Sequence, residues 1–356
     1  MLGKKATPLS VVEHHLALQA QDWPASRWVI GSRLAAAGAP ADEATVSAAY
    51  NAGDIVRAWP MRGTVHAIAA PDLYWLNELA GRRALRGVER RWEVLGIDEK
   101  FLERTRKELH KMLADGRPHT RNEIGAKLAD LGIETNGGIR YHMIWYLTQT
   151  GSLVMGPVDE ASGDHTVVLQ EHHLPTPEAL DEPARERELV ERYLRSHGPA
   201  QLDDVTWWSG LTKGAIRRGI AALDEQVITF DSGGRELMML TDRYEALDPD
   251  CDDSAGSTFA LGAFDEHMLA FKDRTDVIAN ELANKVDAAR NGIFKATIVQ
   301  SGKVVGTWAR KPLTNHVRVT VSPFVKLSAA KRKRVEKALE PWSAFVGREL
   351  EVKFDD

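Results

Sequence analysis

The sequence of 356 residues lacks several features that would place a protein outside the cytoplasm. It has a single cysteine, Cys251, so no disulfide can form within the chain and no cysteine cluster can hold a metal. No stretch reaches the roughly 18 consecutive apolar residues of a membrane span. The basic segment 1–10 is followed by Glu13, His14 and His15 rather than by an apolar run, so no signal peptide is predicted. We therefore expect a cytoplasmic protein that contacts no membrane.

Motifs of cofactor and metal chemistry are also absent. The chain has no glycine-rich phosphate loop, nucleophile elbow or kinase motif. The adjacent pairs His14–His15 and His172–His173 point their side chains apart on a helix or strand, and neither has a second pair at metal-ligand spacing. We expect no metal and no cofactor.

What the sequence contains is one pattern repeated three times: three helices followed by two strands joined by a loop. The second copy is the clearest, because Thr120 and Glu123 match a capping box and residues 139–150 lie where a recognition helix would lie. Its strands at 153–158 and 165–170 enclose a turn-rich wing. The third copy has helices at 183–197, 201–208 and 213–224 and strands at 227–231 and 236–241; the weaker first copy has helices at 10–20, 26–37 and 42–52 and strands at 55–59 and 63–69.

The last part of the chain has a different character. Alternating segments at 291–300 and 303–309 around Ser301–Gly302 predict a hairpin, and a strand at 317–321, a helix at 328–345 and a strand at 349–354 complete a module. The predicted fold class is α+β. It comprises three tandem winged helix-turn-helix units at 1–98, 99–178 and 179–250 and a C-terminal α+β module at 251–356.

Gln19 and Gln21 are the residues whose placement could carry chemistry. In a regular helix, residues i and i+2 point about 200 degrees apart and could not serve one substrate. Pro24 disfavours helical geometry at Trp23, so the helix is expected to end close to Gln21 and both amides can face one cleft. Two uncharged amides can orient a water molecule or grip a base edge, although they are not strong bases. Spacing alone is more typical of two solvated glutamines at a fraying helix end.

Short strings spread over most of the chain carry a family resemblance. They are, in chain order, Leu18–Gln21, Arg62–His66, Phe264–Leu269 with Lys272–Arg274, Asn291–Phe294 and Gly306–Trp308. Each string alone is weak, but together they resemble the signature of AlkZ-type DNA glycosylases, in the winged-helix family that also contains YcaQ. Phe264 and Phe271 stand where the family is expected to have tyrosine, and Ala20 stands where it is expected to have a larger apolar residue.

The resemblance implies a monofunctional DNA glycosylase, a monomer whose winged helices form a C shape around a channel for duplex DNA. It implies bulky N7-alkylated purines as substrates, sometimes with unhooking of crosslinks, and it puts the functional pair on Gln19 and Gln21. An N7-alkylguanine is already cationic, so the enzyme must mainly place water and stabilise positive charge on the sugar. Because no catalytic amine accompanies the motif, we expect hydrolysis without a Schiff base or strand cleavage.

Other residues are expected to contact DNA or to brace the fold. Arg62, Thr64 and His66 would lie on a wing near the glutamines, with Arg62 on a phosphate and His66 in a supporting hydrogen bond. A turn arginine and a satisfied, half-buried histidine are the alternatives. Asp265 and Arg274 are expected to form a structural ion pair. The remaining predicted DNA contacts are in two third helices and the C-terminal hairpin: Arg140, His142, Lys213, Arg217, Arg218 and Lys303.

A non-enzymatic winged-helix regulator is the alternative function. In it, the polar residues of the third helices would read base edges and the glutamines would merely end a helix. A regulator needs a symmetric pair of reading heads, whereas three different units in one chain favour a monomer around one site. The net charge of −5 leaves a third option, an interaction scaffold without DNA binding.

Overall fold

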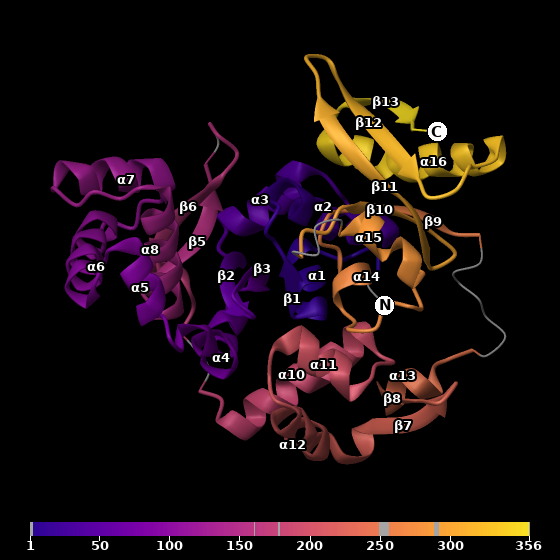
Figure 1. Cartoon of the computed structure of the whole chain (residues 1–356), viewed down its shortest axis with the longest axis horizontal. Coiled ribbons are helices and arrows are strands. Elements are labelled where there is room, and N and C mark those ends of the chain that lie inside the picture. Colours follow the sequence, from indigo (N-terminus) through magenta and orange to yellow (C-terminus); the bar gives the residue numbers. More distant parts are fainter. Residues whose placement is uncertain (1–2, 160, 177–178, 249–255, 288–291, 356) are drawn as a thin grey trace.

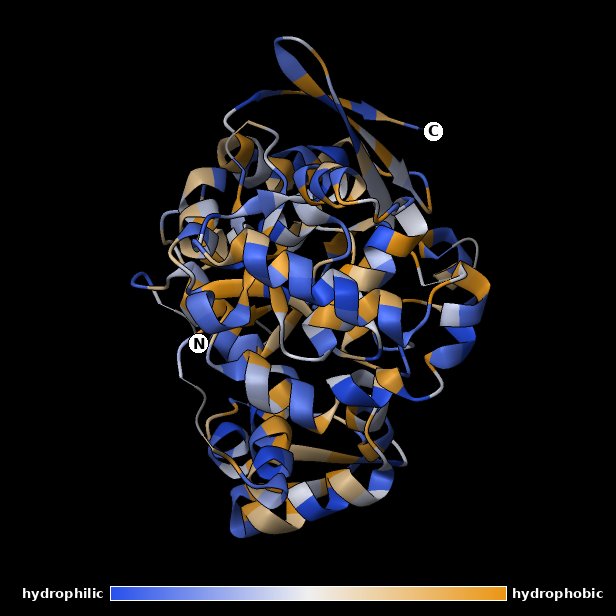
Figure 2. Cartoon of the chain, turned by 90° about the vertical axis from the view of Figure 1, so that its left-hand side faces the viewer, coloured by the Kyte–Doolittle hydropathy of each residue, from blue (hydrophilic) through white to orange (hydrophobic). Residues whose placement is uncertain are grey.

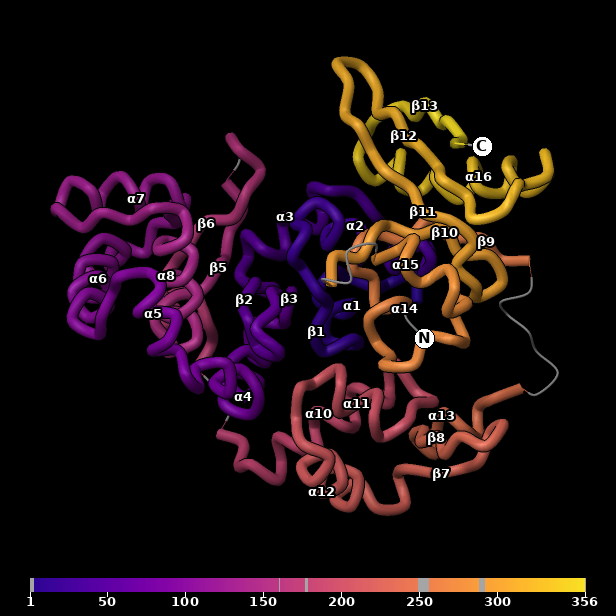
Figure 3. Tube along the Cα trace, in the orientation of Figure 1, coloured from indigo at the N-terminus to yellow at the C-terminus, as the bar shows by residue number. Residues whose placement is uncertain are grey.

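The computed structural model describes residues 3–159, 161–176, 179–248, 256–287 and 292–355, so Cys251 and Asn291 lie outside the described residues. Four segments follow one another along the chain, and Figures 1 and 3 show the first of them in the middle with the other three around it. Figure 2 shows hydrophobic and hydrophilic residues on different sides of the same helices, as expected where one side packs on a core. Among the described helices, none combines the length and apolar content that a membrane span requires.

The first segment has the order helix, strand, helix, helix, strand, strand. Thr7, Asp22 and Asp42 cap its three helices with their side chains, and Pro8 occupies the first turn of the first helix. The elements are α1 (Pro8–His15), β1 (Ala17–Gln19), α2 (Trp23–Ala36), α3 (Glu43–Asn51), β2 (Ile55–Met61) and β3 (Thr64–Ala69).

The first helix is shorter than the predicted range 10–20, and this prediction is wrong in its second half. Helix α1 stops at His15, and Leu16 has a positive φ of 66°, which turns the chain out of the helix. Ala17 and Leu18 are fully buried and enter different hydrophobic clusters. Consecutive side chains on opposite sides are the pattern of an extended strand, so tertiary packing overrides the local helical pattern here.

The second segment repeats this order after a linker of short helices. The predicted capping box is confirmed, because the Thr120 side chain accepts from the N–H of Glu123 at 3.2 Å and the Glu123 carboxylate accepts from the N–H of Thr120 at 2.6 Å. The linker has α4 (Asp72–Leu79), η1 (Gly81–Leu85) and α5 (Glu89–Leu95). The segment has α6 (Glu99–Leu113), β4 (His119–Thr120), α7 (Arg121–Asp130), α8 (Gly137–Gln149), β5 (Leu153–Val158), β6 (His165–Leu169) and α9 (Gln170–His173).

The third segment has three helices and a hairpin close to the predicted ranges. Ala200 forms an isolated bridge with Met238 where the other two segments have a short strand. The elements are α10 (Glu182–His197), α11 (Leu202–Ser209), α12 (Lys213–Leu223), η2 (Asp224–Gln226), β7 (Val227–Ser232), β8 (Arg235–Leu240) and α13 (Thr241–Glu245).

The C-terminal segment is a five-stranded sheet covered by a long helix, with strand order β13-β12-β11-β10-β9. Only β12 and β13 run parallel. The predicted hairpin and final helix are confirmed, whereas β9 was not predicted and β10 begins later than expected. The elements are β9 (Thr258–Leu261), α14 (Glu266–Leu269), η3 (Asn280–Leu282), α15 (Ala283–Val286), β10 (Ala296–Gln300), β11 (Lys303–Pro312), β12 (His316–Pro323), α16 (Ala329–Val346) and β13 (Glu349–Phe354).

The first segment connects the others through its sheet and its two hydrophobic faces. Strand β2 pairs with β5 at Arg57 and Met155, so the first and second segments share a six-stranded sheet of order β1-β3-β2-β5-β6-β4. One hydrophobic cluster joins residues of the first, second and C-terminal segments, and another joins the first and third. Strand β1 lies at the edge of the shared sheet, between these clusters.

Candidate active site

The two glutamines lie side by side at the end of strand β1. Strand β1 pairs with β3 so that Gln19 lies opposite His66, and the N–H of Ala20 extends the ladder by donating to Val65 O at 2.7 Å. Residues two apart on an extended chain point to the same side. Gln19 Nε2 donates to Gln21 Oε1 at 2.6 Å. The two amides therefore converge as expected, but from a strand rather than from a broken helix end.

The pair spans the boundary between the protein interior and solvent. Gln19 is 5% exposed, whereas Gln21 is exposed. The hydrogen bond between them uses the amide group of Gln19 and the carbonyl oxygen of Gln21. This leaves Gln19 Oε1 as an acceptor and Gln21 Nε2 as a donor for a water molecule or a ligand.

A buried carboxylate, that of Glu266, lies behind Gln19. Its Oε1 is 3.4 Å from the backbone nitrogen of Gln19, and its Oε2 accepts from Trp208 Nε1 at 3.0 Å and lies 3.5 Å from His197 Nε2. Burial raises the pKa of Glu266, but His197 and the Trp208 N–H outweigh it, so the pKa is lowered. Glu266 is thus a buried negative charge next to the glutamine strand. The sequence marked it only as part of a motif.

His66, opposite Gln19, is fully buried and so cannot touch DNA in this structure. Its Nδ1 is 2.8 Å from the backbone oxygen of Thr64, which assigns the ring proton to Nδ1. Burial lowers the pKa of His66 to about 4, so the imidazole is neutral at neutral pH. The expected supporting role fits this position, and the half-buried Thr64 holds the ring through its carbonyl group.

Arg62 occupies the turn between β2 and β3 with a positive φ of 54°. Its guanidinium lies 4.9 Å from the centre of the Trp207 ring in α11. The side chain is half-buried and turns toward the third segment. The structure therefore places Thr64 and His66 on the strand that pairs with the glutamine strand, and the Arg62 side chain on Trp207 of the third segment.

A pocket of about 330 Å³ opens beside Gln21, between the first and second segments. Trp59 and Tyr141 form one wall, with Trp59 Nε1 donating to the Tyr141 hydroxyl at 3.1 Å. Arg57 lines the pocket and donates to the backbone oxygen of Ala20, which holds the end of β1 in place. Burial lowers the pKa of Arg57 to about 10, so it remains a cation at neutral pH.

A family model described as DNA glycosylase AlkZ-like matches residues 12–345. The chain belongs to the AlkZ-like family of DNA glycosylases. The resemblance indicated by the motifs is confirmed. Among solved structures the chain is similar to the DNA glycosylase AlkZ of Streptomyces sahachiroi, with a TM-score of 0.76 and 20% identity over 99% of this chain and 94% of that one. At this identity the likeness shows a shared fold. No curated protein sequence matches the chain.

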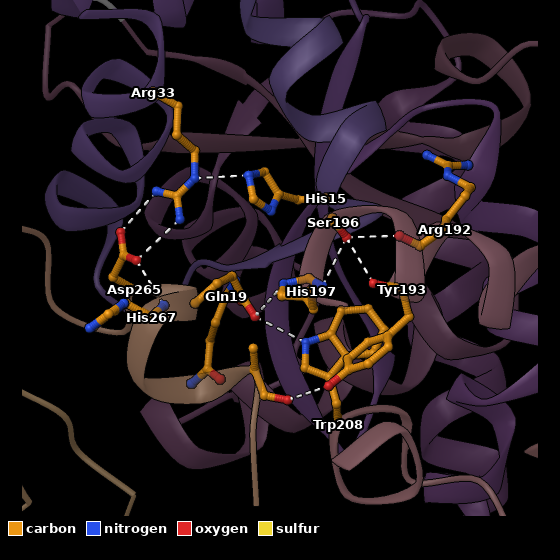
Figure 4. A network of polar contacts seen from close by, with 12 residues as sticks. His15, Gln19, Arg33, Arg192, Tyr193, Ser196, His197, Trp208, Asp265 and His267 are labelled. Carbon is orange, nitrogen blue, oxygen red and sulfur yellow. Dashed lines mark hydrogen bonds and ion pairs between the residues drawn. The ribbon is translucent and has the colours of Figure 1, made fainter. Parts of the chain in front are cut away.

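In this AlkZ-like chain Asp265 does not pair with Arg274, so the predicted ion pair is wrong. Asp265 instead accepts two hydrogen bonds from Arg33 of α2, at 2.9 and 3.1 Å (Figure 4). Burial raises the pKa of Asp265, but the Arg33 guanidinium outweighs it and keeps the carboxylate ionised. Arg274 lies over Trp207 and donates to the backbone oxygen of Met268. The true partner is 232 residues away, which proximity in sequence could not reveal.

Asp22, next to Gln21, has a structural role. Its Oδ1 accepts from the N–H of Ala25 at 2.9 Å and so caps α2. The same oxygen lies 3.3 Å from Arg310 of β11, which ties the C-terminal sheet to this helix. Asp22 therefore binds its own helix and a cation, and the amide pair is formed without it.

The two residues predicted on α8 differ in their surroundings. Arg140 donates to the backbone oxygen of Arg121 at 3.0 Å and lines a second pocket, of about 400 Å³. That pocket shares Arg121, Tyr141 and Asp164 with the one at Gln21. His142 is 6% exposed and packs on Trp145, so in this structure it offers no surface to a base edge, contrary to expectation.

The four remaining predicted contacts do not line either pocket near Gln21. Helix α12 packs against α10 and α11, on the outer side of the third segment in Figure 1. Lys213 pairs with Asp203, Arg218 pairs with the buried Glu186, and Arg217 is exposed. Lys303, at the start of β11, donates to the backbone oxygen of Asp276. Among the described residues, no group of three or more His, Cys, Asp or Glu is arranged to hold a metal ion.

Proposed function

We propose that this chain is a monofunctional DNA glycosylase that hydrolyses the N-glycosidic bond of N7-alkylated purines in duplex DNA. The observation that carries the proposal is the hydrogen-bonded pair of Gln19 and Gln21 at an edge of the shared sheet. We place one water molecule on Gln19 Oε1 and Gln21 Nε2, the acceptor and the donor that the hydrogen bond between the amides leaves over. The oxygen of that water bonds to the anomeric carbon as the N-glycosidic bond breaks, the base leaves as a neutral purine, and the proton of the water passes to solvent.

The chemistry suits uncharged side chains. An N7-alkylpurine carries a positive charge before the reaction and leaves as a neutral base, so the leaving group needs no acid catalyst. The demand falls on positioning the water and on stabilising the positive charge that develops on the sugar. The amides position the water. The buried carboxylate of Glu266 stabilises the positive charge on the sugar through space, because it lies directly behind Gln19 and is ionised.

The pocket beside Gln21 supports a bulky substituent on the base. Its volume of about 330 Å³ lies at the lower end of the range for small-molecule sites. Trp59 and Tyr141 line it with two aromatic rings that pack edge to face. We propose that this pocket accepts the alkyl group of the lesion, and that a crosslinked second base would need the adjoining pocket at Arg140 as well.

The side chains around the pair support hydrolysis without strand cleavage. Among the described residues no lysine lines the pocket at Gln21, and the two cations that line it, Arg57 and Arg121, are guanidinium groups. A Schiff base requires a nucleophilic amine. We therefore propose that the product is an intact strand with an abasic site.

We further propose that the first three segments are winged-helix units within residues 1–98, 99–178 and 179–250. Their common order of elements, ending in a hairpin, supports this proposal. Together with the α+β module at 251–356 they would form a C shape around the duplex, and a monomer would suffice for one lesion. The regulator alternative loses support, because His142 is buried and Lys213 and Arg218 are engaged in ion pairs.

An excision assay on duplexes that carry one N7-methylguanine tests the proposal. The wild-type protein should release the base, and Gln21→Ala should slow the release at least about tenfold, since a single positioned hydrogen-bonding group contributes this much to many reactions. Gln226→Ala, at an exposed glutamine of η2, is the matched control and should leave the rate unchanged. Larger N7 adducts and an N7 crosslink, tested in parallel, define the substrate range.

Two outcomes would contradict the proposal. One is equal release by the wild type and Gln21→Ala. The other is no release by the wild type together with tight binding to one undamaged sequence, which would favour the regulator.

A further inference from the structure

Two guanidinium groups, from distant parts of the chain, lie over the ring of Trp207 in α11. Arg62 comes from the turn between β2 and β3, with its guanidinium carbon 4.9 Å from the ring centre. Arg274 follows α14, with a distance of 4.8 Å, and also lies 5.0 Å from the ring of Phe294. The two arginines and the two aromatic residues are all half-buried, so the cluster is partly open to solvent.

The two cations lack a carboxylate partner. Arg33 and Arg192, which are also partly buried, are ion-paired, but within the described ranges no carboxylate lies within ion-pair distance of Arg62 or Arg274. Burial lowers the pKa of both guanidinium groups, and each is attracted by one acid only through space, Arg62 by Glu266 and Arg274 by Asp287. Positive charge is therefore concentrated here without direct neutralisation.

Hydrogen-bonding capacity is also left over. Arg62 Nε is buried without a partner among the described residues. Arg274 uses Nε for the backbone oxygen of Met268, which leaves the outer nitrogens of its guanidinium. A guanidinium that stacks on an aromatic ring keeps its N–H edge available, and that edge matches two oxygens of a phosphate.

The cluster lies next to the glutamine pair. Gln19 is opposite His66, and Ala20 bonds to Val65, so continuing the register places Gln21 opposite Thr64, two residues from Arg62. The third segment supplies Trp207, and the segment after α14 supplies Arg274. Three parts of the chain thus meet beside the site where we place the target sugar.

We propose that Arg62 and Arg274, held on Trp207, bind the DNA phosphate adjacent to the nucleotide whose base is removed. This inference rests on the proposed function, because it assumes that the target sugar lies at Gln21. The phosphate supplies the anion that the two guanidinium groups lack, and the fork of each group fixes its position. Binding that phosphate sets the distance between the sugar and the water held by the amides.

The salt dependence of DNA binding tests the site. A duplex with a tetrahydrofuran abasic site is titrated with the protein at several NaCl concentrations, and Kd is read by fluorescence anisotropy. Arg274→Gln should weaken binding about tenfold at low salt and reduce the slope of log affinity against log salt by about one. Arg274→Lys keeps the charge and should retain the slope. Arg187→Gln removes a half-buried arginine of α10 that is paired with Glu191, and it should retain both the affinity and the slope.

A methylphosphonate, which removes the charge from one phosphate, identifies the phosphate that is bound. Placed next to the abasic site, it should weaken binding by the wild type about tenfold and add no further loss in Arg274→Gln. Thermal unfolding of each variant checks that it folds. Should a folded Arg274→Gln keep the wild-type affinity and slope, the phosphate site is overturned. Additive losses would also overturn it, because the residue and the phosphate would then act separately.

Failure of this inference differs from failure of the proposed function. If the wild type excises N7-methylguanine while the salt slope of Arg274→Gln is unchanged, the phosphate site is wrong and the glycosylase activity stands. If the slope falls but no base is released, the phosphate site stands and the assignment of the reaction is wrong.

Discussion

Asp265 and Glu266 are neighbours in the chain, and both are buried and ionised, yet their side chains have different partners. Asp265 meets a cation, Arg33, through two hydrogen bonds. Glu266 meets the indole N–H of Trp208, the backbone of Gln19 and the imidazole of His197. Asp265 is thus paired with a permanent cation, whereas Glu266 is held by a histidine and two N–H groups.

The difference suggests that Asp265 stabilises the fold and that Glu266 acts on the reaction. A buried ion pair locks helix α2 to the C-terminal segment, and its net field a short distance away is small. Glu266 has no arginine or lysine within ion-pair distance among the described residues, so we expect its negative field to reach the glutamine pair. We therefore expect changes at Asp265 to act on stability and changes at Glu266 to act on the reaction.

The largest effect is expected at Asp265, whose charge is paired with that of Arg33. Asp265→Asn keeps the shape of the side chain and its cap on α14 but leaves the Arg33 cation unpaired in the interior. The free energy of unfolding should fall by about 3 kcal/mol, as is typical when one partner of a buried ion pair is removed. Urea denaturation measures this. A folded Asp265→Asn with unchanged stability and no excision would reverse the roles that we assign to the two acids.

The next largest effect is on the pH dependence of stability. It comes from His66, which is neutral and lies opposite Gln19. Its pKa of about 4 in the folded protein lies below the unfolded value of about 6.5. As the pH falls, the unfolded chain takes up the proton first, so the stability that His66 contributes is present above pH 6.5 and is lost toward pH 4. Between pH 7 and pH 5 this loss amounts to about 2 kcal/mol.

The control for this prediction is His66→Gln, which cannot take up a proton. Its free energy of unfolding should fall less between pH 7 and pH 5 than that of the wild type. Parallel pH dependences of the two proteins would mean that other buried histidines, such as His165, dominate.

The next effect is smaller in free energy and acts on the excision rate rather than on stability. It is expected for Glu266→Gln. The substitution keeps the size of the side chain and removes the negative charge behind Gln19. Single-turnover excision should slow about tenfold, which corresponds to about 1.4 kcal/mol of transition-state stabilisation. Binding to an abasic-site duplex should stay equal or tighten, because DNA is an anion. A loss of binding with an unchanged excision rate would show that Glu266 only braces the fold.

The smallest effect is expected at Arg217 of α12, which lines neither of the two pockets near Gln21. Arg217→Ala should change excision and DNA binding by less than about twofold, whereas Arg140→Ala, in the pocket next to Gln21, should weaken binding about fivefold. Equal losses in the two variants would show that both third helices contact the duplex.

Local signals predicted much of the secondary structure. The capping box at Thr120 and Glu123, the helical periodicity of α6 and the glycine-containing turns between strands act over a few residues, so they can be read without the rest of the chain. The first helix was extended too far for the opposite reason. Residues 17–19 become a strand because they pair with β3, about 50 residues later, and are buried between two clusters.

By itself, the sequence predicted most of the elements and the membership of the family, and it selected Gln19 and Gln21 as candidates for the site. Tertiary structure alone decided how those glutamines converge and what surrounds them. The carboxylate behind Gln19 is 247 residues away in the chain, and Arg33 reaches Asp265 across 232. Such partners are chosen by burial, since a charge removed from water must take whichever complementary group the packed core brings to it, and packing depends on the whole chain at once.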